Sequence, residues 1–375
     1  MKIEAAVLRS EDSPFVIETL DLAEPAAHQV LVRIVGVGHC HTDVLPRAVA
    51  GFGTPPIVLG HEGAGVVEAV GSAVTTPEVG DHVVLSFDSC GTCPNCIDAH
   101  PAYCQTFLAR NLGGYALDGT TPLTDAAGGP VAGRWFGQSS FASHTVVEAR
   151  NVVVVDKALP LELLGPLGCG VQTGAGAVLE VLKVRPGEGI VVVGAGAVGL
   201  SAIMAARVAG ASPIIAVDLN TKRLDLAREL GATETIVAGT GDLTAQIRDV
   251  VPDGVKYGLD TTGMPTVISA TLDAIALRGT LALVGVQQGD LAVAPLALTA
   301  GRTITGILEG DANPHTFIPT LIALWKAGLF PFDRLITTFP LSEINTAEEQ
   351  ALAGSIVKPV LLVEVRPDSP HRGKS

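Results

Sequence analysis

The sequence predicts an α/β protein in which a β-rich part is followed by a doubly wound parallel sheet covered by helices. Short valine-rich segments bounded by glycine or proline recur through residues 1–170, a pattern typical of strands joined by tight turns. From residue 171 to 313, apolar strand-like segments alternate with helical ones, which indicates βαβ units and a parallel sheet. A chain of 375 residues exceeds one typical domain. We therefore predict domains at 1–170 and 171–313, with 314–375 returning to the first.

Apolar runs and their flanking turn residues predict the individual elements. The predicted strands are residues 29–37, 63–70, 189–193, 213–217 and 359–365. The predicted helices are residues 200–209, 223–230 and 317–327. Gly231 follows the second helix, as a C-cap glycine would. The charged, proline-containing segment 366–375 is predicted to be a frayed tail.

Composition and charge exclude two broad classes of function. A net charge of −14 provides no basic face for the phosphates of nucleic acid. No uninterrupted stretch of about 18 apolar residues, the length of a membrane span, occurs in the chain. The first residues lead directly into strand-like sequence, without the pattern of a signal peptide. We therefore expect a cytoplasmic protein that acts on a small molecule, with no nucleic-acid or membrane partner.

A glycine-rich turn predicts a dinucleotide site. Gly194, Gly196 and Gly199 form a G-x-G-x-x-G pattern that follows a predicted strand and opens a helix, and Val198 lies within it. The three glycines would permit the tight turn, the approach of the pyrophosphate and close helix–strand packing. Asp218 ends the next strand, where it would bind the ribose hydroxyls and disfavour NADP, so NAD is predicted. Nearby Arg223 could instead accept a 2′-phosphate.

Four cysteines in the spacing C-x2-C-x2-C-x7-C predict a structural zinc site. They are Cys90, Cys93, Cys96 and Cys104. Four thiolates in a compact loop form the closed tetrahedral shell that structural zinc prefers. An iron–sulfur cluster and four unligated thiols are the alternatives. Disulfides would suit the even number of cysteines, but they rarely persist in the cytosol.

A second, dispersed set predicts a catalytic zinc. Cys40, His61 and Cys169 would supply the two thiolates and one imidazole of a Cys2His site with an exchangeable position. Glu62 lies beside the histidine. Taken singly, Cys169 could be a small buried apolar side chain, and His61 could be a core histidine.

The local patterns around these residues are similar to one known family. Residues 38–43 (GHCHTD), residues 60–65 (GHEGAG), the four-cysteine loop and the glycine-rich turn occur in the same order as in the zinc-containing medium-chain dehydrogenase/reductase (alcohol dehydrogenase) family. The resemblance extends from about residue 5 to residue 365. It implies a GroES-like, β-rich catalytic domain with an inserted Rossmann domain and an active site between them.

The resemblance also implies roles for individual residues. Cys40, His61 and Cys169 match the catalytic zinc ligands, and Glu62 matches a conditional extra ligand. Asp43 matches the carboxylate that orients the ligating histidine, and Thr42 the hydroxyl that passes on the substrate proton. The residues that match cofactor contacts are His41, Thr173, Val284, Val286 and Lys358, the first and last of them at the pyrophosphate.

Two features place the chain within the family, and one departs from it. Residues 136–142 resemble a segment of aryl-alcohol (benzyl alcohol) and geraniol dehydrogenases. The length between Cys104 and Cys169 resembles that of the longer, usually dimeric members, so a homodimer is favoured over a tetramer. Leu45 occupies the position where other members carry a histidine that ends the proton relay. Because leucine cannot carry a proton, His41 or water would have to complete the route.

These observations predict a zinc-dependent dehydrogenase with two zinc ions per chain that transfers a hydride reversibly from a primary alcohol to NAD. An aromatic or allylic terpenoid alcohol is the expected substrate. The candidate pocket residues, which could equally be ordinary core aromatics, are Phe87, Trp135, Phe136 and Phe141. Glutathione-dependent formaldehyde oxidation is the enzymatic alternative. A catalytically inactive NAD-binding structural or sensor protein is the non-enzymatic alternative.

Overall fold

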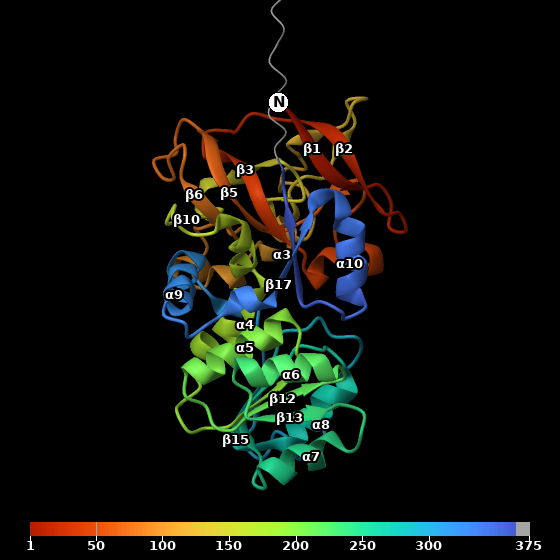
Figure 1. Cartoon of the computed structure of the whole chain (residues 1–375), viewed down its shortest axis with the longest axis vertical. Helices are drawn as coiled ribbons and strands as arrows, with labels where there is room; N and C mark the ends of the chain where they lie inside the picture. Colours follow the sequence, from red (N-terminus) through yellow and green to blue (C-terminus); the bar gives the residue numbers. More distant parts are fainter. Residues whose placement is uncertain (50, 365–375) are drawn as a thin grey trace, which may run out of the picture.

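The computed structural model describes residues 1–49 and 51–364, which form two lobes stacked along the long axis of the molecule (Figure 1). The predicted tail at 366–375 lies outside the described residues. One lobe contains the chain up to about residue 170, and the elements after α9 (Pro314–Lys326) return to it. The other lobe is an α/β sandwich. The β-rich part followed by a parallel sheet is therefore confirmed as the fold class.

Two sheets make up the first lobe. The five-stranded sheet has the order β4 (Ile57–Val58), β1 (Lys2–Leu8), β2 (Phe15–Leu22), β7 (Leu123–Thr124), β8 (Pro130–Val131). The second sheet has the order β10 (Val152–Val155), β6 (His82–Leu85), β5 (Glu62–Val70), β3 (Gln29–Gly38), β18 (Lys358–Leu362), β17 (Ile336–Pro340), and β9 (His144–Glu148) also pairs with β3. Because β18 pairs antiparallel with β3, the C-terminal segment completes the sheet that carries the metal-binding residues.

The second lobe is built on a six-stranded parallel sheet. Its order is β13 (Glu234–Val237), β12 (Ile214–Asp218), β11 (Ile190–Val193), β14 (Val255–Asp260), β15 (Ile275–Leu283), β16 (Thr303–Gly306). If the six strands are numbered 1 to 6 from β11 to β16, their order in the sheet is 3-2-1-4-5-6, the order of a Rossmann fold. The chain reverses its winding between β11 and β14, and ligands bind such sheets at the carboxyl ends of the strands at this point.

Helices cover both faces of the parallel sheet and connect the lobes (Figure 1). The helices of the second lobe are α5 (Ala197–Val208), α6 (Thr221–Leu230), α7 (Leu243–Val250) and α8 (Pro265–Ala274). The remaining helices are α1 (Leu45–Ala48), α2 (Pro94–Ile97), α3 (Phe107–Asn111), α4 (Gly170–Gly176), α9 and α10 (Ile344–Leu352). Of these, α4 matters most for function, because it packs closely against α5 across the junction of the lobes.

Each predicted strand and helix has a counterpart, and most differences lie at their starts. The helix predicted at 317–327 begins at Pro314, because proline suits the first helical turn and the Asn313 side chain caps the N–H of His315. The helix predicted at 200–209 begins at Ala197, directly on the glycine-rich turn. Gly231 ends α6 with a φ of +133°. The strand predicted at 359–365 is β18, and residue 365 lies outside the described residues.

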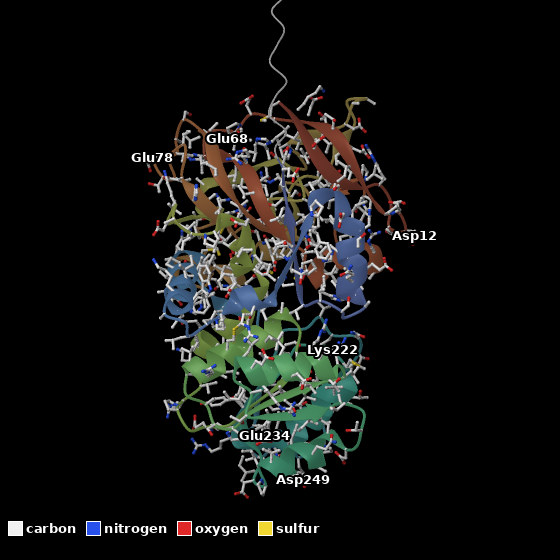
Figure 2. All side chains as sticks on the ribbon, in the orientation of Figure 1. Asp12, Glu68, Glu78, Lys222, Glu234 and Asp249 are labelled. Atoms are coloured by element: carbon white, nitrogen blue, oxygen red, sulfur yellow. The ribbon has the colours of Figure 1, made fainter. Side chains whose placement is uncertain are left out.

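The surface carries the negative charge that the composition predicts. Figure 2 shows acidic side chains such as Glu78, Glu234 and Asp249 at the periphery of both lobes. Among the described residues, no helix has the length and apolar character needed to cross a lipid bilayer.

Candidate active site and metal centres

The dispersed metal-binding residues converge at the edge of the first lobe. Cys40 directly follows β3, His61 and Glu62 lie at the start of β5, and Cys169 is the N-cap of α4. Their ligand atoms all lie within 4.8 Å of one another. His61 Nε2 is buried and has no hydrogen-bond partner among the described residues. Two thiols and an unpartnered imidazole nitrogen fit a catalytic zinc.

Asp43 fixes the orientation of the histidine. Its carboxylate is fully buried and accepts a hydrogen bond from His61 Nδ1 at 2.8 Å, so that Nε2 is left to face the other ligand atoms. The second oxygen of Asp43 accepts the backbone N–H of Cys40 at 3.0 Å. One carboxylate therefore positions two of the candidate ligands, an arrangement common around protein-bound zinc.

Glu62 is held by a buried cation. Both of its carboxylate oxygens lie 2.9 Å from Lys358 Nζ, and one accepts the N–H of Gly170 at 3.1 Å. The lysine also donates to the carbonyl oxygen of His39. Burial alone would lower the pKa of Lys358, but the charge of Glu62 raises it above its usual value. Lys358 is thus engaged with a metal-site carboxylate, and its predicted contact with a pyrophosphate stays a prediction.

The residues predicted to move a proton lie on the short helical segment that follows Cys40. In η1 (His41–Val44), Thr42 Oγ1 lies 3.8 Å from Cys40 Sγ, while the His41 side chain is exposed. Leu45 begins the next turn and is partly buried. A hydroxyl group therefore stands beside the metal-binding set, with an exposed imidazole as its sequence neighbour.

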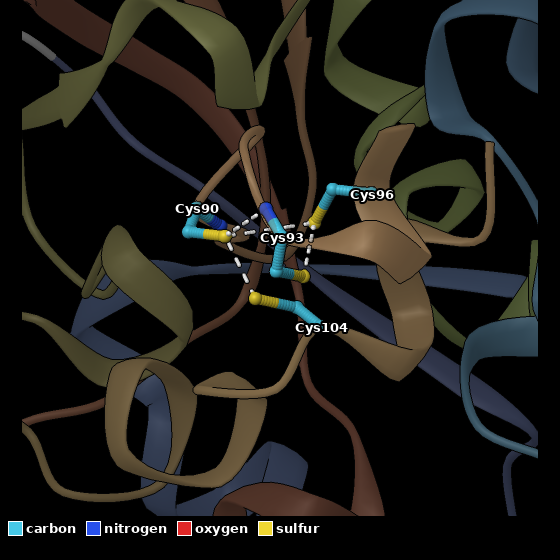
Figure 3. Close-up of side chains that lie close together, drawn as sticks. All are labelled: Cys90, Cys93, Cys96 and Cys104. Atoms are coloured by element: carbon cyan, nitrogen blue, oxygen red, sulfur yellow. Dashed lines mark hydrogen bonds between the residues drawn. The ribbon is translucent and has the colours of Figure 1, made fainter. Parts of the chain in front are cut away.

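The four-cysteine loop gathers its thiols around one point (Figure 3). The ligand atoms of Cys90, Cys93, Cys96 and Cys104 all lie within 4.8 Å of one another. Cys96 Sγ lies 3.5 Å from Cys93 Sγ and 3.9 Å from Cys90 Sγ. The N–H groups of Thr92 and Cys93 lower the pKa of the Cys90 thiol to about 5, which favours a metal-binding thiolate.

These separations distinguish the alternatives for the loop. A disulfide requires sulfurs about 2.0 Å apart, and all six cysteines are free thiols. Thiolates on one tetrahedral ion with metal–sulfur bonds of about 2.3 Å lie about 3.8 Å apart, close to the distances found. A cluster would insert inorganic sulfide between the thiolates and separate them further. The loop therefore fits a single metal ion.

The glycine-rich turn has the shape that the sequence predicts. Gly194 directly follows β11 and has a φ of +95°, a conformation that glycine adopts without strain. A Cβ on Gly199 would collide with the carbonyl oxygen of Gly194, so close helix–strand packing requires glycine here. In contrast, a Cβ on Gly196 would meet no atom within 4 Å. The space beside Gly196, at the N-terminus of α5, suits a phosphate group.

Small residues bring this turn against the metal site. Across the junction of α4 and α5, a Cβ on Gly174 would collide with the carbonyl oxygen of Val198. A Cβ on Gly170 would lie 3.5 Å from Lys358 Nζ and 3.9 Å from Val198 Cγ2. Thr173, partly exposed, lies on the same helix between these glycines. The metal site and the candidate cofactor turn therefore adjoin.

The other candidate cofactor residues lie around the carboxyl ends of the parallel strands. Asp218 ends β12 and accepts the N–H groups of Ala195 and Asn220, which fastens it to the glycine-rich turn. Arg223 donates to the carbonyl oxygen of Ile356. Val284 directly follows β15, and Val286 is exposed.

Comparison with known proteins identifies the family. Residues 26–157 match the alcohol dehydrogenase GroES-like domain, and residues 197–326 match the zinc-binding dehydrogenase domain. A geraniol dehydrogenase from Castellaniella defragrans is 46% identical over 365 residues, covering 96% of this chain and 97% of that protein. The chain belongs to the zinc-containing alcohol dehydrogenase family. All the candidate ligands of the dispersed set lie together in this alcohol dehydrogenase, which argues against the inactive sensor protein.

Two solved structures share the whole fold of this alcohol dehydrogenase. An alcohol dehydrogenase zinc-binding domain protein from Burkholderia ambifaria is 48% identical, and benzyl alcohol dehydrogenase from Acinetobacter calcoaceticus is 42% identical. Each superposes with a TM-score of 0.94 and covers 97% of this chain and 100% of the other. The likeness therefore includes both lobes.

Two residues of the alcohol dehydrogenase site were missed by the sequence analysis. Glu309, in η8 (Glu309–Asp311), lies with Oε1 3.6 Å from Cys169 Sγ. Gln172 Nε2 donates to the other oxygen of Glu309 at 3.2 Å and to the carbonyl oxygen of Gly168. Burial raises the pKa of Glu309 to about 7. Neither residue lies in a recognisable motif, so no sequence signal marked them.

The aromatic residues expected to line a substrate pocket are all buried in this alcohol dehydrogenase. Phe136 stacks on the His61 ring with centroids 4.4 Å apart. Phe141 stacks on His39 at 5.8 Å, and Phe87 lies against Phe107. Trp135 has no exposed surface. Phe136 thus contacts a candidate metal ligand, His61. Trp135 contacts Asp43, the carboxylate that orients this histidine.

Proposed function

We propose that this enzyme catalyses the reversible, NAD-dependent oxidation of an aromatic or allylic primary alcohol to the aldehyde. One observation carries the proposal: the ligand atoms of Cys40, His61 and Cys169 converge beside the glycine-rich turn. Such a site would bring a Lewis acid to the hydroxyl oxygen of the substrate and a hydride acceptor to the carbon that carries this oxygen. The names of the geraniol and benzyl alcohol dehydrogenases to which the chain is similar support the substrate class.

We assign one catalytic and one structural zinc ion to each chain. Cys40, His61 and Cys169 would hold the first, with Glu62 as an additional ligand, and the four-cysteine loop would hold the second. Zinc bound at the first site supplies Lewis acidity that lowers the pKa of a substrate hydroxyl, and NAD supplies the hydride acceptor.

The protein's own residues would then remove the proton. Thr42, beside Cys40, would accept the hydroxyl proton and release its own towards the cofactor site. Leu45 has no titratable group, so the proton leaves through the exposed His41 or through water. His41 also contacts the pyrophosphate in this proposal.

The cofactor would extend across the carboxyl ends of the parallel strands. The open space at Gly196, on the N-terminus of α5, would hold its pyrophosphate, with Lys358 as a further contact. Thr173, Val284 and Val286 would hold the nicotinamide. Asp218 would accept hydrogen bonds from the ribose hydroxyls, with Arg223 nearby.

Replacing Asp218 with asparagine is expected to reduce the preference for NAD over NADP at least about tenfold. The carboxylate repels a 2′-phosphate, and about 1.4 kcal/mol of lost repulsion corresponds to a factor of ten. The ratio of kcat/KM for the two cofactors measures the effect. Asp242→Asn is the matched control, because Asp242 caps α7 in the same lobe. An unchanged ratio in Asp218→Asn would contradict the assignment of the ribose contact.

Turnover of benzyl alcohol or geraniol is expected to exceed that of ethanol at least about a hundredfold in kcat/KM, because a large apolar substrate buries more apolar surface when it binds. The measurement is NADH formation with a panel of alcohols, before and after zinc removal. Formaldehyde with glutathione completes the panel. A kcat/KM for ethanol equal to those for benzyl alcohol and geraniol would refute the substrate class. Activity that requires glutathione would favour formaldehyde oxidation.

We also propose a homodimer in a reducing compartment such as the cytoplasm. The distance in sequence between Cys104 and Cys169 supports the dimer. So does β16, which is the edge strand of the parallel sheet, with the exposed Leu296 and Leu298 in the preceding segment. The six free thiols support a reducing compartment.

A further inference from the structure

The segment from η3 (Trp135–Gly137) to Phe141 surrounds the histidine of the metal site. Trp135 contacts Asp43, which orients His61, while Phe136 stacks on the His61 ring. Gln138 Nε2 donates to the carbonyl oxygen of His61 at 2.9 Å. One short segment therefore contacts the ring, the backbone and the supporting carboxylate of a single candidate ligand.

The carboxylate of Asp43 is the centre of this arrangement. Oδ1 lies 2.8 Å from His61 Nδ1, 3.0 Å from Trp135 Nε1 and 3.1 Å from the backbone nitrogen of Gly60. Oδ2 accepts the N–H of Cys40. A buried carboxylate that accepts several N–H groups has one defined orientation. Removal of one donor lets Oδ1 rotate toward the remaining two, and the imidazole moves with it.

Two residues of the segment adopt backbone conformations that are uncommon for residues other than glycine. Phe136 and Ser139 have φ angles of +50° and +52°. Trp135 N donates to Ser139 Oγ at 2.9 Å across the turn. Left-handed conformations of residues other than glycine cost free energy and persist where the surrounding structure requires them, often at functional sites. Here they direct Trp135 to Asp43 and Phe136 to His61.

We propose that Trp135 is a positioning residue of the metal centre, which fixes Asp43 through its indole N–H and thereby holds His61 in place for the metal. The inference rests on the proposed zinc site at Cys40, His61 and Cys169. A buried tryptophan needs a hydrogen-bond partner in any protein. The test must therefore separate retention of the metal from stability of the fold.

The chain provides a matched control for this test. Trp325 Nε1 donates to Asp333 Oδ1 at 2.8 Å, and its ring contacts Phe332 edge to face. This indole–carboxylate hydrogen bond is nearly as long as the one between Trp135 and Asp43. Trp325 lies on α9, outside the metal site. Trp135→Phe and Trp325→Phe each remove one such bond and keep an aromatic ring. Trp325 is only partly buried, so the unfolding midpoints can differ, but loss of an indole hydrogen bond outside the metal site should not change zinc release.

Zinc release to a colorimetric chelator and the thermal unfolding midpoint are measured for both variants and the wild type. Trp135→Phe is expected to release one of the two zinc ions about 10 to 100 times faster than wild type, the usual effect of removing a group that supports a metal ligand. Trp325→Phe should release both at the wild-type rate. Equal release from Trp135→Phe and wild type, or equal acceleration in both variants, would overturn the proposal.

A spectroscopic readout and a second variant make the test independent of activity and of folding. With cobalt(II) in the catalytic site, Trp135→Phe should shift the visible absorption bands, whereas Trp325→Phe should leave them unchanged. Phe136→Leu removes the ring stacked on His61 and should accelerate the release of the same zinc ion. It replaces Trp135→Phe if that variant does not fold, and wild-type release would then overturn the proposal. Wild-type protein that holds no metal at this site would instead refute the proposed metal centre.

Discussion

Replacing His61 with alanine is expected to lower kcat/KM for alcohol oxidation at least about a thousandfold. His61 provides the one nitrogen in the set of Cys40, His61, Glu62 and Cys169, and its Nε2 is buried without a partner among the described residues. Metal polarisation of the substrate contributes several kcal/mol to catalysis, and each 1.36 kcal/mol corresponds to a factor of ten in rate. The variant should also lose one of the two proposed zinc ions.

Two measurements distinguish this result from general damage. Zinc analysis should find the ion of the four-cysteine loop still present, because Cys90, Cys93, Cys96 and Cys104 do not contact His61 in the structure. NAD binding, measured by quenching of tryptophan fluorescence, should persist. His28→Ala, on the exposed surface, should keep wild-type activity. A His61→Ala enzyme with both zinc ions and normal turnover would exclude His61 from the metal site.

The chemistry of the residue types made the convergence of both candidate metal-binding sets predictable from the sequence. Thiols and imidazoles have few functions in common other than metal binding, so their spacing is informative even when the residues lie far apart in the chain. Cys40, His61 and Cys169 converge because β3 and β5 are neighbours in one sheet and α4 begins beside them. The glycine-rich turn was predictable because its backbone conformation and packing require glycine at Gly194 and Gly199.

The supporting contacts could not be predicted, because they depend on pairs distant in sequence and on common residue types. Nothing in the sequence links Trp135 to Asp43, or Glu309 to Cys169. Pairing of β18 with β3 places Lys358 on Glu62, a contact that no local pattern in the sequence indicates. Such partners are selected by the register of distant strands, which local patterns do not encode.

Replacing Lys358 with methionine is expected to lower the free energy of unfolding by about 3–5 kcal/mol. The exposed fractions of the Lys358 and Glu62 side chains are 3% and 0%, and the charged groups are 2.9 Å apart. Removing one partner of a buried ion pair leaves the other charge without compensation in a medium of low polarity. Here the stranded carboxylate of Glu62 would also lie beside the thiols of Cys40 and Cys169. Urea denaturation of the zinc-free protein measures the loss, because a zinc ion beside Glu62 would itself compensate the charge of this carboxylate.

A double variant that removes both buried charges and a variant of an exposed ion pair are the controls. Lys358→Met combined with Glu62→Gln removes both charges and should recover most of the lost stability, because the cost comes from one unpaired charge rather than from the absence of the pair. Lys2 and Asp21 form an exposed ion pair with nearly the same separation, 3.0 Å. Lys2→Met should therefore cost less than about 1 kcal/mol. Equal losses in Lys2→Met and Lys358→Met would show that burial does not determine the strength of the Lys358–Glu62 interaction.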